Sequence, residues 1–268
     1  MISNDPRTAF NAKFETANFS AKPSLTPTPR MKASRASALV LIREAVIPPY
    51  TPPMPLESPR FPNVRIYDHP LIQHKLTIMR DKRTEHEQFR HLLNQITGLM
   101  AYDVCRNLGV RPLEIETPIT RMTGVELAAT TTIVPILRAG LAMMDGILAL
   151  FPEAHVGHIG IFRDEKTAKP VTYFAKFPAN IAHGPVILVD PMLATGGSAI
   201  HAVNLIKDAG CRDIRLVSLV AAPEGIAALH AAHPDLPIHV ASVDERLNER
   251  FYIVPGLGDA GDRIFGTQ

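Results

Sequence analysis

The chain has 268 residues, of which 46% are hydrophobic and 20% are charged, and its formal net charge is +2. This balance is typical of a folded protein with an ordinary core, in one large domain or two small ones. It argues against a general nucleic-acid-binding surface, and no apolar run reaches the roughly 18 residues of a membrane-spanning helix. Cys105 and Cys211 lie far apart and match no metal-ligand spacing, so we expect free thiols in a reducing cytoplasm.

Residues 1–60 differ in composition from the rest of the chain. Prolines recur from Pro23 to Pro59, and apolar periodicity is poor. The segment therefore predicts a mostly disordered N-terminal arm ahead of a folded domain over residues 61–268. Two alternatives stay open: an organellar transit peptide, against which acidic residues such as Glu15 count, and a translation start at Met54.

A pattern of alternating strands and helices begins near Asp68. The expected elements are helices around residues 89–100, 141–148, 200–206 and 224–230, strands at 130–137, 159–162, 186–189, 214–221 and 238–241, and a hairpin arm at 171–174. Strands that alternate with helices in this way predict an α/β fold, with a largely parallel, twisted sheet flanked by helices.

The stretch after the strand at 186–189 carries the strongest functional signal. Its four apolar residues are typical of a strand buried on both faces, and the chain then breaks at Asp190 and Pro191. Thr195, two glycines and Ser198 follow, where a helix begins. Glycines let backbone N–H groups converge, and the hydroxyls and the helix N-terminus add donors, so the loop predicts a phosphate site. An ordinary tight turn is the alternative; the spacing fits neither a Walker A loop nor a dinucleotide fingerprint.

Two arginines, Arg138 and Arg163, each directly follow a predicted buried strand. Because the carboxyl ends of adjacent parallel strands meet at one crevice, these charges together with Asp190 predict a site for a polyanion. Solvated surface arginines are the alternative. Arg80 and Arg83 are weaker candidates for phosphate or effector contact.

The C-terminal segment contains a literal G-x-G-x-x-G at Gly256, Gly258 and Gly261. A dinucleotide fingerprint needs a helix-length sequence after it, and the chain stops too soon, so we interpret the glycines as a loop whose backbone approaches a flat ligand. His230 and His233 are expected to be surface residues of a helix, because no further ligand completes a zinc site.

Three blocks of the sequence resemble a known family. Residues 134–140 spell VPILRAG, residues 190–198 spell DPMLATGGS, and residues 252–267 form the glycine-rich tail. Together they resemble the uracil branch of the type I phosphoribosyltransferases, from about residue 61 to residue 268. The resemblance implies the type I fold with a C-terminal base-binding loop, and the conversion of uracil and phosphoribosyl pyrophosphate (PRPP) to UMP and diphosphate in pyrimidine salvage. Pro191 departs from the adjacent pair of acidic residues that is usual in the type I family.

The resemblance also implies roles for individual residues. The catalytic positions would be Arg138, Asp190 and Asp259. PRPP would be bound by Arg138, Arg163, Asp259 and the loop residues Asp190, Pro191, Met192, Leu193, Ala194, Thr195, Gly196, Gly197 and Ser198. Uracil would be bound, mainly through backbone groups, by Ile253, Gly258, Asp259 and Ala260. Mg²⁺ would be held mainly through PRPP, so no dedicated metal site is expected.

The family resemblance implies further partners and a location. GTP would be a candidate allosteric activator, the chain would form a homo-oligomer (a dimer or a tetramer), and the enzyme would be cytoplasmic, without a nucleic-acid or membrane partner. Two other functions stay open. One is an RNA-binding regulator of pyrimidine genes on the same fold, which would need a more basic face than a net charge of +2 suggests. The other is a phosphoribosyltransferase for another base.

Overall fold

The computed structural model describes residues 61–163 and 170–267. The N-terminal arm predicted over residues 1–60 lies outside these ranges and stays a prediction. Arg163 is described as a backbone position only, at the end of its strand.

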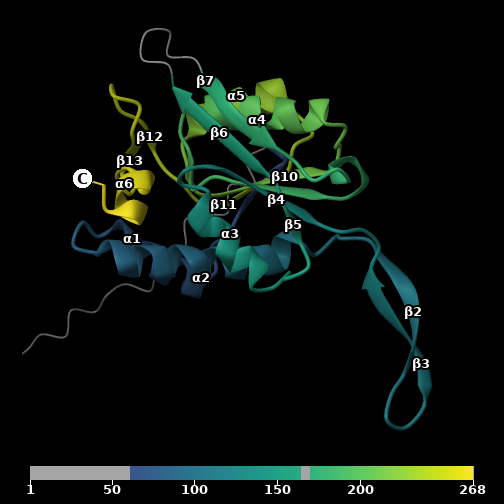
Figure 1. Cartoon of the computed structure of the whole chain (residues 1–268). Helices are drawn as coiled ribbons and strands as arrows, with labels where there is room; N and C mark the ends of the chain where they lie inside the picture. Colours follow the sequence, from purple (N-terminus) through teal and green to yellow (C-terminus); the bar gives the residue numbers. More distant parts are fainter. Residues whose placement is uncertain (1–60, 164–169, 268) are drawn as a thin grey trace, which may run out of the picture. The chain divides into compact units, whose positions relative to one another are not determined.

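A mostly parallel sheet forms the centre of the fold (Figure 1). Its strands run in the order β1-β11-β10-β8-β4-β6-β7, and neighbours along this path are parallel except β6 and β7. The short strands β5 and β9 pair with β4 and β10. The bounds are β1 Val64–Ile66, β4 Thr132–Leu137, β5 His155–Val156, β6 His158–Arg163, β7 Pro170–Lys176, β8 Val186–Val189, β9 Met192–Leu193, β10 Ile214–Ala221 and β11 Ile238–Val243. The predicted α/β fold with a largely parallel sheet is confirmed.

Helices cover both faces of this sheet (Figure 1). One face carries α1 (Pro70–Arg80), α2 (His86–Val104) and α3 (Leu141–Leu148), and the other carries α4 (Gly197–Asp208) and α5 (Pro223–Ala232). Each face buries its own hydrophobic cluster, one around Phe89 and Met143 and the other around Val203 and Leu229. The central strands β4, β8 and β10 are therefore shielded from water on both sides, which is the usual setting of parallel strands.

Strand β8 shows why its sequence is apolar at every position. Ile187 and Val189 belong to the cluster under α1, α2 and α3, whereas Val186 and Leu188 belong to the cluster under α4 and α5. All four side chains are fully buried. Since successive strand residues point to opposite faces, a strand with helices on both sides favours apolar side chains at every position.

Two hairpins differ from the expected arrangement. The hairpin predicted at 171–174 lies in β7, which returns antiparallel to β6 and forms an edge of the main sheet. The arm that extends away from the sheet is a second hairpin, β2 (Val110–Glu116) with β3 (Arg121–Leu127), which the sequence prediction missed (Figure 1). The signal was present, because residues 113–116 alternate apolar and acidic side chains, as a strand does.

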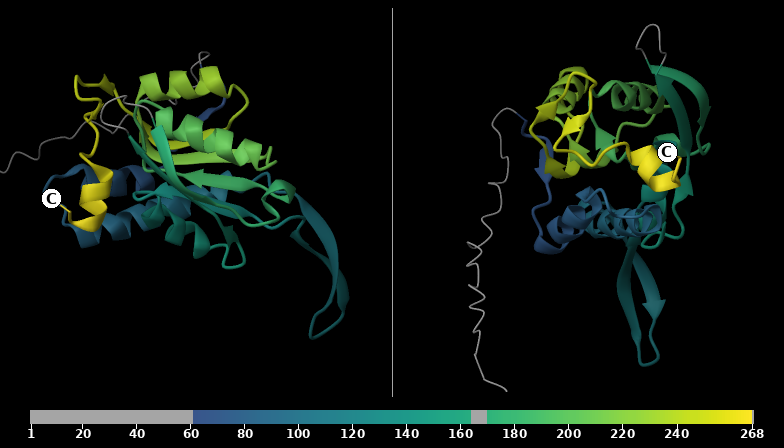
Figure 2. Two further views of the ribbon diagram at one scale, coloured as in Figure 1. Left: turned by 45° about the horizontal axis from the view of Figure 1, so that its top comes forward. Right: turned by 90° about the vertical axis from the view of Figure 1, so that its left-hand side faces the viewer.

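The C-terminal segment forms a small unit beside the helices α1 and α2 (Figure 2). It consists of the antiparallel pair β12 (Arg246–Leu247) and β13 (Ile253–Val254), a glycine loop and the short helix α6 (Ala260–Phe265). α6 packs against α2. Within residues 61–163 and 170–267, no helix is both long and apolar enough to cross a membrane.

The prediction for His233 was wrong. His230 lies in α5, where its Nδ1 is 3.1 Å from Asn63 Oδ1, but His233 follows the helix as its C-cap and is only 6% exposed. Burial, together with the positive charge of Lys207 at 3.0 Å from its Nδ1, lowers the pKa of His233. This histidine is a buried contact between α4 and α5, and its imidazole is not a surface group.

Candidate active site

Three neighbouring strands end beside one another at the carboxyl edge of the sheet. β4 lies between β8 and β6, and all three are parallel, so the structure brings together the backbone positions of Arg138, Asp190 and Arg163. Gly140 makes the turn after β4 possible, because a Cβ there would overlap the Val189 carbonyl of the adjacent strand. The predicted convergence of strand ends is confirmed for the backbone.

Asp190 follows β8 and is half-buried. Its N–H continues the parallel ladder by donating to the Val217 carbonyl at 3.2 Å. Burial raises the pKa of its carboxyl group to about 7, and the Met192 N–H, which donates to the carboxylate, opposes this shift. Near neutral pH the group therefore divides between a protonated form and a carboxylate that accepts hydrogen bonds from hydroxyl groups.

The two glycines of the following loop have different settings. Gly196 has a φ of +83°, and a Cβ there would lie 2.9 Å from the Gly225 carbonyl oxygen, so this position requires glycine. At Gly197 the φ is not positive, and a Cβ would meet only Thr195 Oγ1, at 3.8 Å. α4 begins at Gly197 without a side-chain cap, so its first N–H groups are available to an anion.

The remaining loop residues divide by exposure. Pro191 and Leu193 are buried, and β9, which contains Leu193, pairs with β10. Met192 and Ala194 are partly buried, Thr195 is exposed, and Ser198 is half-buried. Any ligand contact at the two buried residues would use backbone atoms, whereas the Thr195 hydroxyl is accessible.

The exposed Arg138 side chain connects this edge to the C-terminal helix. Its guanidinium carbon lies 5.8 Å from the centroid of the Phe265 ring, within reach of a cation–π contact. Phe265 is the last residue of α6, so the tail segment reaches the strand ends although the two are far apart in the sequence.

The tail residues predicted to bind a base have two different settings. Gly258, with a φ of +79°, and Asp259 are exposed, whereas Ile253 and Ala260 are each only 4% exposed and pack in the core. A ligand contact at Ile253 or Ala260 would therefore use backbone atoms. Asp259 caps α6, because its carboxylate accepts a hydrogen bond from the Asp262 N–H at 3.0 Å.

Arg80 and Arg83, the weaker candidates for phosphate contact, have other partners in this structure. Arg80 pairs with the buried Asp244 at 2.6 Å and donates to the Gly256 carbonyl, also at 2.6 Å. Arg83 forms an exposed ion pair with Asp81 at 2.5 Å, and its hydrogen bonds hold the pKa of Asp81 well below its usual range. Both candidates are thus engaged within the protein.

Arg263 is a supporting residue that the sequence did not reveal. Its guanidinium donates to the carbonyls of Met79, Leu257 and Asp81 at 2.6, 3.0 and 2.7 Å, and it lies 4.5 Å from the centroid of the Phe89 ring. Met79 is 184 residues away in the sequence, and Asp244 is 164 residues from Arg80. No local motif marks such distant partners, so periodicity and spacing could not have found them.

A cavity of about 430 Å³ lies between the α1–α2 turn and the tail loop. Its lining includes the exposed pair Gly258 and Asp259, with charges of both signs from Lys82, Glu85 and Arg263. Two of the four positions predicted to bind the base therefore line a hollow of small-molecule size.

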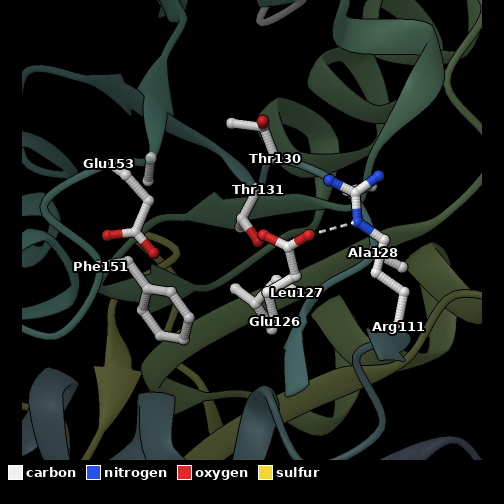
Figure 3. A pocket seen from close by; sticks show the side chains of 10 residues that line it. Arg111, Glu126, Leu127, Ala128, Thr130, Thr131, Phe151 and Glu153 are labelled. Atoms are coloured by element: carbon white, nitrogen blue, oxygen red, sulfur yellow. Dashed lines mark hydrogen bonds and ion pairs between the residues drawn. The ribbon is translucent and has the colours of Figure 1, made fainter. Parts of the chain in front are cut away.

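A second cavity, of about 320 Å³, lies at the foot of the β2–β3 hairpin (Figure 3). Arg111 and Glu126 form an ion pair at 2.8 Å beside it, and Phe151 and Glu153 line its other side (Figure 3). Thr131, directly before β4, also lines it. This is the amino end of the strand whose carboxyl end carries the candidate site, so we do not assign the reaction to this cavity.

Comparison with known families agrees with this geometry. The family described as uracil phosphoribosyltransferase matches residues 66–267. The chain belongs to this family. Relatives named uracil phosphoribosyltransferase from Staphylococcus aureus strains Newman and N315 are each 55% identical over 206 residues, which is 76% of this chain and 99% of the relative. The solved structure of the AQ2163 protein from Aquifex aeolicus is 35% identical, has a TM-score of 0.73, and covers 76% of this chain and 99% of its own.

Membership of the uracil phosphoribosyltransferase family confirms the resemblance found in the three sequence blocks. Enzymes that carry this name are pentosyltransferases, so the expected enzyme class is confirmed as well. Membership does not test the roles of individual residues. Arg138, Asp190 and Asp259 stay predicted catalytic residues of this family member.

Proposed function

We propose that this chain transfers the 5-phosphoribosyl group of PRPP to uracil, giving UMP and diphosphate in pyrimidine salvage. One observation carries the proposal: the open loop at the N-terminus of α4 directly follows Asp190, at the strand edge that Arg138 shares. A 5′-phosphate on this loop, ribose hydroxyls on Asp190 and a diphosphate near Arg138 would give each of these groups a matching partner.

Transfer of the phosphoribosyl group from PRPP does not require a covalent intermediate with the protein. If bond breaking at the anomeric carbon runs ahead of attack, the transition state resembles an oxocarbenium ion, and catalysis consists of positioning and charge neutralisation. Arg138 would neutralise part of the departing diphosphate, with Arg163 at the end of the adjacent strand as the second cation. Asp190, as a carboxylate, would hold the ribose hydroxyls.

The base would be selected by backbone groups of the tail loop. Uracil presents two carbonyl acceptors and an N3–H donor, so its pocket must offer donors beside an acceptor. Within the described residues, neither the N–H nor the C=O of Gly258 has a hydrogen-bond partner, and both are free to serve. Ile253, Asp259 and Ala260 complete the proposed set. Cytosine would leave such groups unpaired, which costs about 1–3 kcal/mol each.

The proposed Mg²⁺ is held mainly through PRPP. Among the described residues, no three His, Cys, Asp or Glu side chains are grouped to hold a metal ion. Asp190, as a described carboxylate at the strand edge, fits an ion whose other ligands are substrate oxygens and water, a common arrangement for Mg²⁺ with phosphate substrates. When bound, the ion would supply positive charge to the diphosphate.

A homo-oligomer, either a dimer or a tetramer, is part of the proposal. The β2–β3 hairpin pairs with no other described strand and leaves Ile119 94% and Val125 71% exposed. An isolated two-stranded hairpin is marginally stable in water, so contact with a second copy would favour it. A cytoplasmic location is supported by Cys105 and Cys211, which are both free thiols. GTP activation rests on the family resemblance alone.

A panel of bases tests the proposed function. Purified protein is mixed with PRPP and Mg²⁺ and, in turn, uracil, cytosine, adenine, guanine or hypoxanthine, and diphosphate release is followed. We expect release with uracil only. Release with another base would point to a different phosphoribosyltransferase, and no release with any base would favour a regulatory protein on the same fold. Repeating the uracil assay with added GTP tests the activator.

A further inference from the structure

The loop between β13 and α6 turns sharply at Gly256. Its φ is +61°, and a Cβ there would overlap the Ile253 carbonyl, so the turn requires glycine. Both polar backbone groups of Gly256 are bonded to side chains of other elements. Its N–H donates to Asp244 Oδ2 at 2.9 Å, and its C=O accepts from Arg80 Nη1 at 2.6 Å. A peptide held at both groups has little freedom to shift.

The two side chains that hold Gly256 also hold each other. Arg80 donates to both carboxylate oxygens of Asp244, at 2.7 and 2.6 Å, and the Ser242 hydroxyl donates to the same carboxylate at 2.8 Å. The Asp244 side chain is 2% exposed and that of Arg80 is 22% exposed. A bidentate pair shielded from solvent fixes the plane of the guanidinium. The position of Gly256 is therefore set by the ends of α1 and β11.

Gly258, whose backbone groups are free within the described residues, directly follows the two residues that are held by side chains. Arg263 donates to the carbonyl of Leu257, the residue after Gly256, at 3.0 Å. Gly258 comes next, and it is exposed and without a hydrogen-bond partner among the described residues. Gly256 and Leu257 lead directly into Gly258, so the position of its unbonded N–H and C=O depends on both of these anchors.

We infer that Arg80 and Asp244 are positioning residues for base selection: by fixing Gly256, they set where the backbone of Gly258 meets the base. The inference rests on the proposed function. Neither side chain is assigned a contact with the reacting atoms. Positioning is sensitive to distance, and a misplacement of about 1 Å can cost on the order of 100-fold in rate. A purely structural role would instead lower the melting temperature without separating the two substrates.

The variants Arg80→Lys and Asp244→Asn distinguish these roles. Lysine cannot bridge two carboxylate oxygens and a carbonyl as the planar guanidinium does, and an asparagine amide presents a donor in place of one acceptor. We expect the KM for uracil to rise about tenfold or more and the preference for uracil over cytosine to fall several-fold, while the KM for PRPP changes by less than about twofold.

Asp103→Asn is the matched control. The Asp103 carboxylate accepts from Arg65 at 2.6 Å and from Arg106 at 2.7 Å, and its side chain is 12% exposed. This substitution also disrupts a shielded carboxylate with arginine partners, although Arg65 and Arg106 are themselves 59% and 58% exposed, and the cluster does not contact the tail loop. It should lower the melting temperature and leave both KM values near wild type. Ser242→Ala, which removes one donor to Asp244, should produce a milder form of the uracil effect.

Parallel increases in both KM values, or wild-type values in Arg80→Lys and Ser242→Ala, would overturn the inference. If Asp244→Asn does not fold, Arg80→Lys and Ser242→Ala still distinguish a positioning role from a purely structural one. Failure of the proposed function is seen separately, because the wild-type protein would then not use uracil, and the inference would fall with it.

Discussion

The donor edge (Asp190, the loop after it and the start of α4) and the tail loop (residues 255–259) are the two proposed ligand-binding regions, and they are supported differently. At the donor edge, β8, the glycine loop and α4 follow one another directly in the sequence, and buried strands hold them. The tail loop is supported by side chains, chiefly Arg80, Asp244 and Arg263. A change at the donor edge should therefore act directly on the ligand, whereas a change near the tail loop can act from a distance.

The largest effect is expected from Asp190→Asn. An amide accepts less strongly from ribose hydroxyls than a carboxylate does, and losing one charge-assisted hydrogen bond in the transition state costs about 2–4 kcal/mol, or roughly 30- to 1000-fold in kcat/KM. Steady-state kinetics of the purified variant measures this loss. Asp208→Asn, at the exposed end of α4, is the control and should keep wild-type activity. Wild-type activity in Asp190→Asn would remove the carboxylate from the proposed site.

Gly197→Val should weaken PRPP binding about 10- to 100-fold without unfolding the protein, because its side chain would occupy the open space at the loop. The backbone tolerates the change, since φ is not positive there and a Cβ has no close neighbour. Calorimetric titration with PRPP gives the affinity. Gly196→Ala is the contrasting variant: it should lower the melting temperature, because Gly196 is left-handed and crowded. Normal PRPP affinity in Gly197→Val would exclude the loop as the phosphate site.

Asp259→Asn is expected to reduce PRPP use about tenfold and to leave the preference for uracil over cytosine unchanged. Asparagine is as good an N-cap as aspartate, so α6 should remain capped. Competition between the two bases at fixed PRPP measures the preference. Loss of the preference would mean that the carboxylate reads the base, contrary to the backbone model.

The smallest effect is a pH dependence that separates the two regions. Burial raises the pKa of Asp190 to about 7, so its carboxylate form increases as the pH rises. The kcat/KM for PRPP should rise about threefold between pH 6.5 and 7.5, and this rise should be absent in Asp190→Asn. Although burial alone would raise the pKa of Asp244, the Arg80 guanidinium holds it below its usual range. The preference for uracil over cytosine should therefore not change between pH 6.5 and 7.5. If the kcat/KM for PRPP rose equally with pH in the wild-type protein and in Asp190→Asn, the assignment of the pH dependence to Asp190 would be wrong.

The donor edge could be predicted because its information is local. Four consecutive apolar residues, an aspartate and a glycine pair specify a buried strand, a break and a helix start, and the structure has them in that order. Sequence could not show which glycine is left-handed, since that depends on contact with the Gly225 carbonyl. The sequence also could not show that Arg80 forms an ion pair with Asp244, because partners that are 164 residues apart produce no local sequence pattern. The β2–β3 hairpin was missed although its alternation was visible.

The carbonyls that surround Arg263 imply an order of events during synthesis. Met79 and Asp81, at the end of α1, leave the ribosome long before Arg263, which follows Met79 by 184 residues. At about 5–20 residues per second, that interval is roughly 10–40 s. Through this time the carbonyls of Met79 and Asp81 lack the guanidinium that they meet in the finished protein. The contact that joins the turn to the tail loop can therefore form only after almost the whole chain has been made.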